Sequence, residues 1–265
     1  MELIDSHCHF DFDAFAGDRD TVWQRCRDLG LKGLVIPGVS ISQWQTLFEL
    51  LRLRPDWYGA VGVHPWWVEA FLAGPGGQDK QLLLEDLREQ LSSWGRRERC
   101  VAVGECGLDR GVETPLEHQC DIFRVHLATA CELELPLIIH VHRYHAEVLS
   151  LLKEYRPARG GVIHAFSGSE EIAREYWQLG FYLGIGGTIT YSRALKTRRA
   201  VAAMPLESLV LESDAPDMPL SGRQGQRNSP ENLPDIAVAL AALRGIPVEE
   251  VAVQTFRNTE LLFAL

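Results

Sequence analysis

The 265-residue sequence contains no apolar run that approaches the roughly 18 residues of a membrane-spanning helix. Its first residues, MELIDSHCHF, are acidic and lack the apolar segment of a signal peptide. The six cysteines form no C-x-x-C pair and no zinc-knuckle spacing, so we expect reduced thiols rather than disulfides. These absences predict a cytoplasmic protein without a membrane partner, and no feature of the sequence indicates an obligate protein partner.

Positive charge is also scarce, with 26 Lys and Arg residues against 36 Asp and Glu residues and a net charge of −10. A chain with this charge has no general attraction for nucleic acid or for anionic membranes. A phosphate-bearing substrate would therefore need a local positive site, either clustered arginines or bound metal ions. The other values, 46% hydrophobic and 23% charged residues, exclude a disordered or collagen-like chain and indicate a globular protein.

Eight short and nearly continuous apolar runs are present, which is typical of parallel strands buried on both faces. They cover residues 2–9, 32–38, 57–65, 100–107, 135–142, 160–168, 181–187 and 208–216. Helical patterns lie between them at about 18–30, 41–54, 79–95, 115–134, 143–155, 169–180 and 229–244. Eight such units predict an α/β fold, a (β/α)8 TIM barrel, as a single domain over residues 1–265.

A doubly wound sheet is the alternative fold for alternating strands and helices. The sequence does not favour it, because no G-x-G-x-x-G motif follows the first apolar run. The glycine-rich stretch GPGG at residues 74–77 predicts a surface insertion in the third strand-to-helix loop.

Residues that bind metal ions well stand where the predicted strands end. The first run closes with His7 and His9, and alternate residues of a strand point to the same side, so both imidazoles can reach one ion. A structural histidine pair is an equal alternative for this motif alone. In a barrel, however, catalytic residues come from the carboxyl ends of several strands. We therefore expect a metal site built from His7, His9, Glu105, His140, His164 and Asp214.

Six ligands exceed the roughly three protein ligands of an open catalytic zinc site, so the set predicts two ions that share a carboxylate. Glu105 lies between the two histidine groups in strand order and is assigned the bridge. A carboxylated lysine is the alternative bridge. The chain has only Lys32, Lys80, Lys153 and Lys196, and none of them ends the fourth or fifth run.

Six separated motifs, in this order, resemble the TatD-related metal-dependent hydrolases, also called TatD-type DNases. They are DSHCHF (5–10), GVHP (62–65), GECGLD (104–109), PLIIH (136–140), HAFSG (164–168) and ESDAP (212–216). The resemblance runs from residue 3 to the C-terminus, and residues 214–226 look most like the YjjV subgroup. It implies a TIM barrel with two divalent ions (Mg²⁺, Mn²⁺ or Zn²⁺) and an activity as a DNase or 3′→5′ exonuclease.

The resemblance also implies how the ligands divide. His7, His9, Glu105 and Asp214 would hold one ion, whereas Glu105, His140 and His164 would hold the other. The chain departs from the family where H-x-R commonly follows the fifth strand, because His142 replaces the arginine and Arg143 comes next. His142 is then either an additional phosphate donor or a surface residue.

Two further residues are expected to contact the substrate. His64 ends the third run and so lies at the same mouth, although a structural role is the alternative. Arg143 is expected to bind phosphate, because a guanidinium group matches phosphate oxygens in pairs. Asp109 is expected either to orient a ligand or to shape its loop. Arg223 and Arg227 belong to a substrate-facing lid or to a solvated loop.

The remaining histidines and cysteines are expected to have structural roles. His118, His126 and His145 lie in helical segments, and Cys8 and Cys106 should point away from the ions because neighbouring strand residues alternate.

Two ions would clamp a phosphodiester and acidify the attacking water, and Asp214 would accept the proton of that water as the general base. The sequence therefore predicts a metal-dependent phosphoester hydrolase that acts on DNA or a nucleotide-like molecule. One alternative is a hydrolase of a cyclic amide, a lactone or a phosphotriester that uses the same metals. The other is a metal-dependent scaffold without activity.

Overall fold

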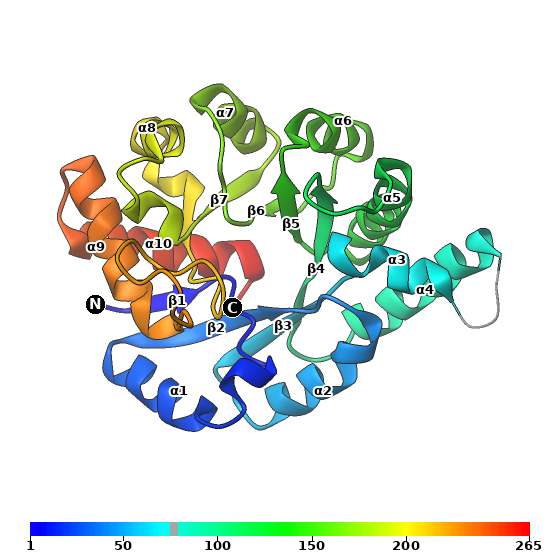
Figure 1. The fold of residues 1–265 in the computed structure, drawn as a ribbon, viewed down its shortest axis with the longest axis horizontal. Helices are drawn as coiled ribbons and strands as arrows, with labels where there is room; N and C mark the ends of the chain where they lie inside the picture. Colours follow the sequence, from blue (N-terminus) through cyan, green and yellow to red (C-terminus); the bar gives the residue numbers. More distant parts are fainter. Residues whose placement is uncertain (75–78) are drawn as a thin grey trace.

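Eight parallel strands lie side by side in sequence order in a computed structural model that describes residues 1–74 and 79–265. The strands are β1 (Leu3–Asp5), β2 (Leu31–Pro37), β3 (Trp57–Val61), β4 (Cys100–Asp109), β5 (Leu137–His142), β6 (Gly161–Ile163), β7 (Phe181–Ile185) and β8 (Leu209–Leu211). The amide of Ser6 donates to the carbonyl of Leu211 at 2.9 Å, which joins the β1 and β8 ends of the sheet. The predicted (β/α)8 barrel is confirmed (Figure 1).

Helices surround the strands on the outside of the barrel (Figure 1). They are α1 (Arg19–Asp28), α2 (Ile41–Arg52), α3 (Val68–Ala73), α4 (Lys80–Gly95), α5 (Leu116–Leu133), α6 (His145–Tyr155), α7 (Glu170–Gln178), α8 (Leu195–Ala203), α9 (Leu233–Arg244) and α10 (Val248–Phe263). Within the described residues, no helix is both long and apolar enough to cross a membrane.

Each strand overlaps one of the eight apolar runs, but the runs do not predict the residues at which the strands end. β1 ends at Asp5 although the first run continues to residue 9, so His7 and His9 belong to the loop that follows the strand. By contrast, β4 extends beyond its apolar run to Asp109, so Glu105 lies inside this strand rather than at its end. The GPGG insertion predicted at 74–77 lies outside the described residues except for Gly74.

The interior of the barrel is a separate apolar core. It consists of inward-facing strand residues together with the end of α10: Val35, Ala60, Ala102, Ile138, Val162, Val210, Leu262 and Phe263. A larger core lies between the outer side of the strands and the helices, and it contains both Cys8 and Cys106. The alternation of side chains along each strand separates the two cores.

Three helices, α3, α8 and α10, lie outside the segments expected to be helical. In α10 the buried face carries polar residues, which interrupt the apolar period that marks a helix. These polar residues have partners: the side-chain amide of Asn258 donates to the carbonyls of Leu206 and Leu209 at 2.9 and 2.7 Å. This contact attaches α10 to the segment that enters β8.

Candidate metal centre

The six predicted ligands converge at the carboxyl end of the barrel. Five of them are buried, with 0–8% exposure, and His140 is half-buried. The backbone sets part of this arrangement, because the amide of Asp214 donates to the carbonyl of His7 at 2.9 Å. That bond holds the loop after β8 against the loop after β1, although the two are about 200 residues apart in the sequence.

The two carboxylate oxygens of Glu105 face different histidines. Oε2 lies 3.2 Å from Nε2 of His7 and 3.5 Å from Nε2 of His9. Oε1 lies 3.2 Å from Nδ1 of His140 and 3.8 Å from Nε2 of His164. The carboxylate thus stands between the two histidine groups, which is the position that a bridge between two ions requires.

Asp214 lies close to three histidines of the same centre. Its Oδ1 lies 3.5 Å from Nε2 of His7, 3.6 Å from Nε2 of His9 and 3.7 Å from Nε2 of His164. Asp214 is therefore in contact with the histidines that the sequence assigned to both ions.

The donor set fits divalent metal ions. Ligand atoms of His7, His9 and Glu105 all lie within 4.8 Å of one another. Among the described residues, Oε2 of Glu105 has no hydrogen-bond partner although it is buried. A buried carboxylate oxygen without a partner is unfavourable, and imidazole with carboxylate is a set that Zn²⁺ and Mn²⁺ accept.

The electrostatics of the centre agree with this fit. Burial, aided by the neighbouring His164, lowers the pKa of His7 well below its ordinary value, and burial lowers the pKa of His9 to about 4. Both imidazoles are therefore neutral and keep the lone pair that a metal needs. Burial raises the pKa of Asp214 to about 8. This carboxyl group therefore needs an adjacent cation to be ionised at neutral pH.

Asp109 orients His140. Its Oδ2 lies 3.1 Å from Nε2 of His140, which leaves Nδ1 of that ring directed at Glu105. The same carboxylate accepts from the indole of Trp66 at 3.0 Å and lies 2.6 Å from Nδ1 of His142. Burial would raise the pKa of Asp109, but the hydrogen bonds, led by that of His140, lower it well below its ordinary value. Asp109 has contacts that fit both roles expected for it, because its Oδ2 faces His140 and its Oδ1 accepts from the amide of Gly111 at 2.6 Å in the loop that follows β4.

Glu212 is a site residue that the sequence analysis did not assign. It is fully buried, and its Oε1 lies 3.1 Å from Nδ1 of His164 and 2.5 Å from the amide of Ala165. The sequence feature that could have identified Glu212 is its position directly after the apolar residues of β8. A buried acid at such a position needs a charged or polar partner.

The acidic surroundings of His164 favour a positive charge. Burial would lower the pKa of His164, but the carboxylates of Glu212, Asp214 and Glu105 raise it to about 10. The same negative potential attracts a metal cation, which would take the place of the proton on Nε2.

His64 lies in the centre as a hydrogen-bond donor. Its Nδ1 accepts from the amide of Trp66 at 3.1 Å, so the neutral ring carries its proton on Nε2, 3.4 Å from Oε1 of Glu105. Burial lowers the pKa of His64 to about 3, which keeps the ring neutral. His126 accepts from the amide of Val63 at 2.9 Å and so fixes this loop, in agreement with the structural role expected for His126.

The predicted arginines lie outside the pocket. Arg143 is exposed and follows β5 at the rim. Arg227 pairs with Asp18 at 2.7 Å, and Arg223 pairs with Asp235 at 2.7 Å. These two pairs attach the loop after β8 to neighbouring parts of the barrel.

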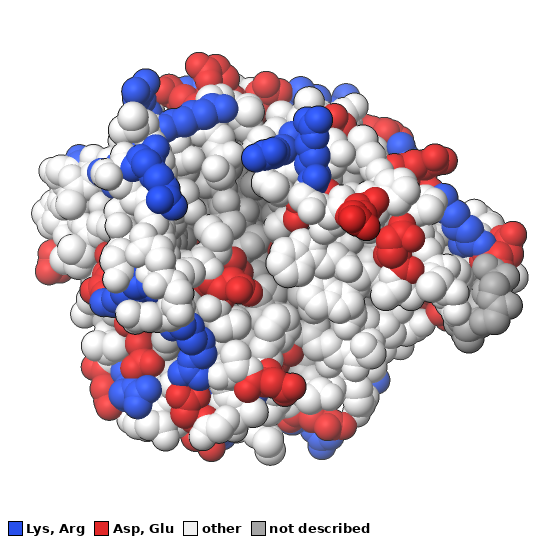
Figure 2. All heavy atoms as spheres, in the orientation of Figure 1, with Lys and Arg blue, Asp and Glu red and all other residues white. Residues whose placement is uncertain are grey.

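A cavity of about 350 Å³ opens over the centre. Besides the polar residues already named, the cavity is lined by Asp217 and by apolar side chains: Phe12, Val39, Trp66, Trp67, Ala165 and Met218. Figure 2 shows a hollow in the middle of this face, with Lys and Arg side chains on the part of the rim near α6 and α8. The cavity lies in the size range of about 300–1,000 Å³ that is usual for small-molecule sites.

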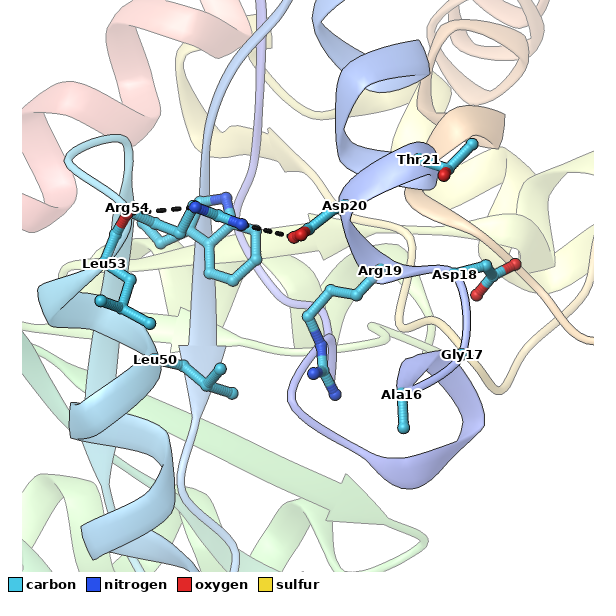
Figure 3. Close-up of a pocket in the computed structure, with 10 residues that line it drawn as sticks. Ala16, Gly17, Asp18, Arg19, Asp20, Thr21, Leu50, Leu53 and Arg54 are labelled. Carbon is cyan, nitrogen blue, oxygen red and sulfur yellow. Dashed lines mark hydrogen bonds and ion pairs between the residues drawn. The ribbon is translucent and has the colours of Figure 1, made fainter.

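A second hollow lies on the outer wall between α1 and α2 (Figure 3). None of its described lining residues is histidine or cysteine, and its Asp20 is paired with Arg54. Arg19, which also lines it, donates to the carbonyls of Phe10 and Asp11, both at 2.8 Å. Arg19 therefore holds the loop that follows His9, and the described lining residues of the hollow bring together no set of metal ligands.

Comparison with known proteins places the chain in a family. The family model described as "TatD related DNase" matches residues 4–264. The Escherichia coli (strain K12) protein named "Uncharacterized metal-dependent hydrolase YjjV" is 40% identical over 262 residues, which cover 98% of this chain and 97% of that protein. The crystal structure of E. coli YjjV superposes with a TM-score of 0.90 at 39% identity, covering 99% of this chain and 98% of the other.

A relative with a more specific name is the "3'-5' ssDNA/RNA exonuclease TatD" of Erwinia tasmaniensis. It is 34% identical over 260 residues, which cover 95% of each chain. The resemblance seen in the six motifs, including that to YjjV, is thus confirmed over nearly the whole length. The chain belongs to the TatD family of metal-dependent hydrolases.

Proposed function

We propose that this hydrolase cleaves phosphodiester bonds in DNA or a nucleotide-like substrate, removing nucleotides from the 3′ end of a strand. The observation that carries the proposal is the position of Glu105 between two histidine groups, one at each carboxylate oxygen. Such an arrangement suits two ions a few ångströms apart, which is the pattern of many phosphodiester-cleaving enzymes. The name of the Erwinia tasmaniensis relative supports the choice of substrate.

We assign the ligands to the two ions in the division that the family resemblance implies. His7, His9 and Asp214 would hold one ion, His140 and His164 would hold the other, and Glu105 would bind both. When bound, two divalent ions supply positive charge to a phosphoryl oxygen and acidify a nearby water. They would also provide the local positive site that a chain with a net charge of −10 needs for a phosphate.

The protein side chains would supply the proton transfers and the orientation. Asp214 would accept the proton of the attacking water, because its carboxylate faces the centre and its pKa is raised toward neutrality by burial. His64 would donate its Nε2 proton in a hydrogen bond to a phosphate oxygen. Arg143 at the rim would contact a neighbouring phosphate of a longer strand.

The test uses the purified full-length protein with 3′- and 5′-labelled single- and double-stranded oligonucleotides. Metal content is measured on the same sample before chelation, after chelation, and after addition of Mg²⁺, Mn²⁺ or Zn²⁺. We expect release of 3′-terminal nucleotides that stops on chelation and returns with metal. Intact DNA in a fully metal-loaded sample that hydrolyses a cyclic amide, a lactone or a phosphotriester would contradict the proposal.

A further inference from the structure

Trp66 is the most exposed aromatic residue in the described part of the chain, and it lines the cavity of the metal centre. Its side chain is 62% exposed. Burying an indole in the core is strongly favourable, so an exposed tryptophan beside a site suggests a use for its surface.

Trp66 is nevertheless held in place. Its indole N–H donates to Oδ2 of Asp109 at 3.0 Å, and its ring lies nearly parallel to that of Trp67, at 22° with centroids 6.1 Å apart. Its backbone amide is fixed as well, since it donates to Nδ1 of His64. An aromatic ring that is both exposed and fixed loses little entropy when a flat group stacks on it.

The position of Trp66 relates it to the reacting centre. Its ring centroid lies 5.4 Å from that of His64, whose Nε2 is 3.4 Å from Glu105. One side chain therefore separates Trp66 from the residue proposed to bridge the ions. In a nucleotide, the base is likewise only a sugar away from the phosphate that is cleaved.

We propose that Trp66 is a stacking platform for the unpaired base of the nucleotide next to the cleaved phosphate. This inference rests on the proposed phosphodiesterase function and gives a physical reason for action on single strands, the DNA substrate in the name of the Erwinia tasmaniensis relative, because a base within a duplex is already stacked and paired. The indole N–H is occupied by Asp109, so only the ring surface is available and the preference among bases should be weak. Such contacts tolerate all bases because each has a flat π-face.

The test compares a short single-stranded oligonucleotide with the same strand carrying abasic units in place of its 3′-terminal nucleotides. The measured quantity is the ratio of kcat/KM on the first strand to that on the second. Loss of one base–aromatic stacking contact corresponds to about a 5- to 140-fold change. We expect Trp66→Leu to lower the ratio by that factor, because leucine keeps apolar bulk but has no ring.

Two variants separate stacking from a merely structural role. Trp66→Phe keeps a ring but loses the hydrogen bond to Asp109, so both rates should fall together while the ratio stays near wild type. Trp177→Leu removes a half-buried tryptophan of α7 that packs on Tyr182 outside the cavity, and both rates and ratio should be unchanged.

The outcomes distinguish failure of the stacking role from failure of the proposed function. A Trp66→Leu ratio equal to wild type overturns the stacking role, and so does equal cleavage of both strands by the wild type, while the phosphodiesterase function stands. If the wild type with full metal cleaves neither strand, the proposed function fails and the inference fails with it.

Discussion

The two ends of the barrel are built by the same eight strands but bury opposite kinds of side chain. Toward the amino end, apolar strand residues of the barrel interior pack against Leu262 and Phe263 of α10 and form an apolar core. At the carboxyl end, imidazoles and carboxylates are buried just as deeply, and some of their atoms lack partners among the described residues.

In this barrel, the residues that stabilise the fold and the residues that bind ligands therefore lie in different parts of one sheet. Apolar burial at the amino end stabilises the fold directly. Polar burial at the carboxyl end opposes folding until a cation compensates the charge, which makes that end a strong ligand site. Changes at the two ends should therefore affect different measurements.

The largest effect is expected from Glu105→Ala at the carboxyl end. Because both carboxylate oxygens face histidines of the centre, this change should release both ions and lower activity by several orders of magnitude. His164→Ala should mainly affect one ion. Metal content by elemental analysis, measured alongside turnover, checks both variants. Two retained metal equivalents and near-normal turnover in Glu105→Ala would show that the bridging assignment is wrong.

Asp214→Asn should separate catalysis from metal binding at the same end. The amide keeps an oxygen for a metal but cannot accept a proton at neutral pH. If Asp214 is the general base, turnover should fall by about 10²- to 10⁴-fold with metal content near wild type. A parallel loss of metal, with activity partly restored by added metal, would instead indicate a ligand. Full metal with undiminished turnover would remove Asp214 from both roles.

At the amino end, Leu262→Ala should destabilise the fold by about 2–5 kcal/mol, the usual loss for a buried leucine. Leu262 is 3% exposed, whereas its neighbour Leu261 is 60% exposed and provides the matched control. Leu261→Ala should change stability by less than about 0.5 kcal/mol. Denaturant unfolding measures both, and turnover per folded molecule should be unchanged. A selective loss of metal in Leu262→Ala would contradict the separation of the two ends.

The smallest effect is expected from Glu212→Gln, which acts on the centre through His164. The amide can still accept from Ala165, but it loses the charge that orients and polarises the imidazole. Loss of such a supporting carboxylate typically weakens metal affinity or activity about 10- to 100-fold. A metal titration measures the affinity, with Glu207→Gln, an exposed glutamate just before β8, as the control. Equal affinities in the two variants would show that Glu212 does not support His164.

Much of the fold was predictable because parallel strands buried on both faces leave long apolar runs. Each part of the fold that the sequence did not predict has its own cause. In α10, Asn258 lies on the buried face but hydrogen-bonds to strand carbonyls, so its partner cannot be seen in the sequence. The end of β1 also differs from the predicted one, because the loop residues that carry His7 and His9 are as deeply buried as the strand itself.

The sequence by itself determined the barrel, the family and the six predicted ligands that meet at the carboxyl end, because parallel strands in chain order bring their ends to one face. Only the tertiary structure decided which atoms face which. That Glu212 serves His164, that Asp109 serves His140, and that Nε2 of His64 carries the proton all depend on contacts between segments far apart or on backbone geometry. Residue spacing specifies the strand and the face of a side chain, whereas the direction of each ring nitrogen depends on the hydrogen-bond partners that folding brings to it.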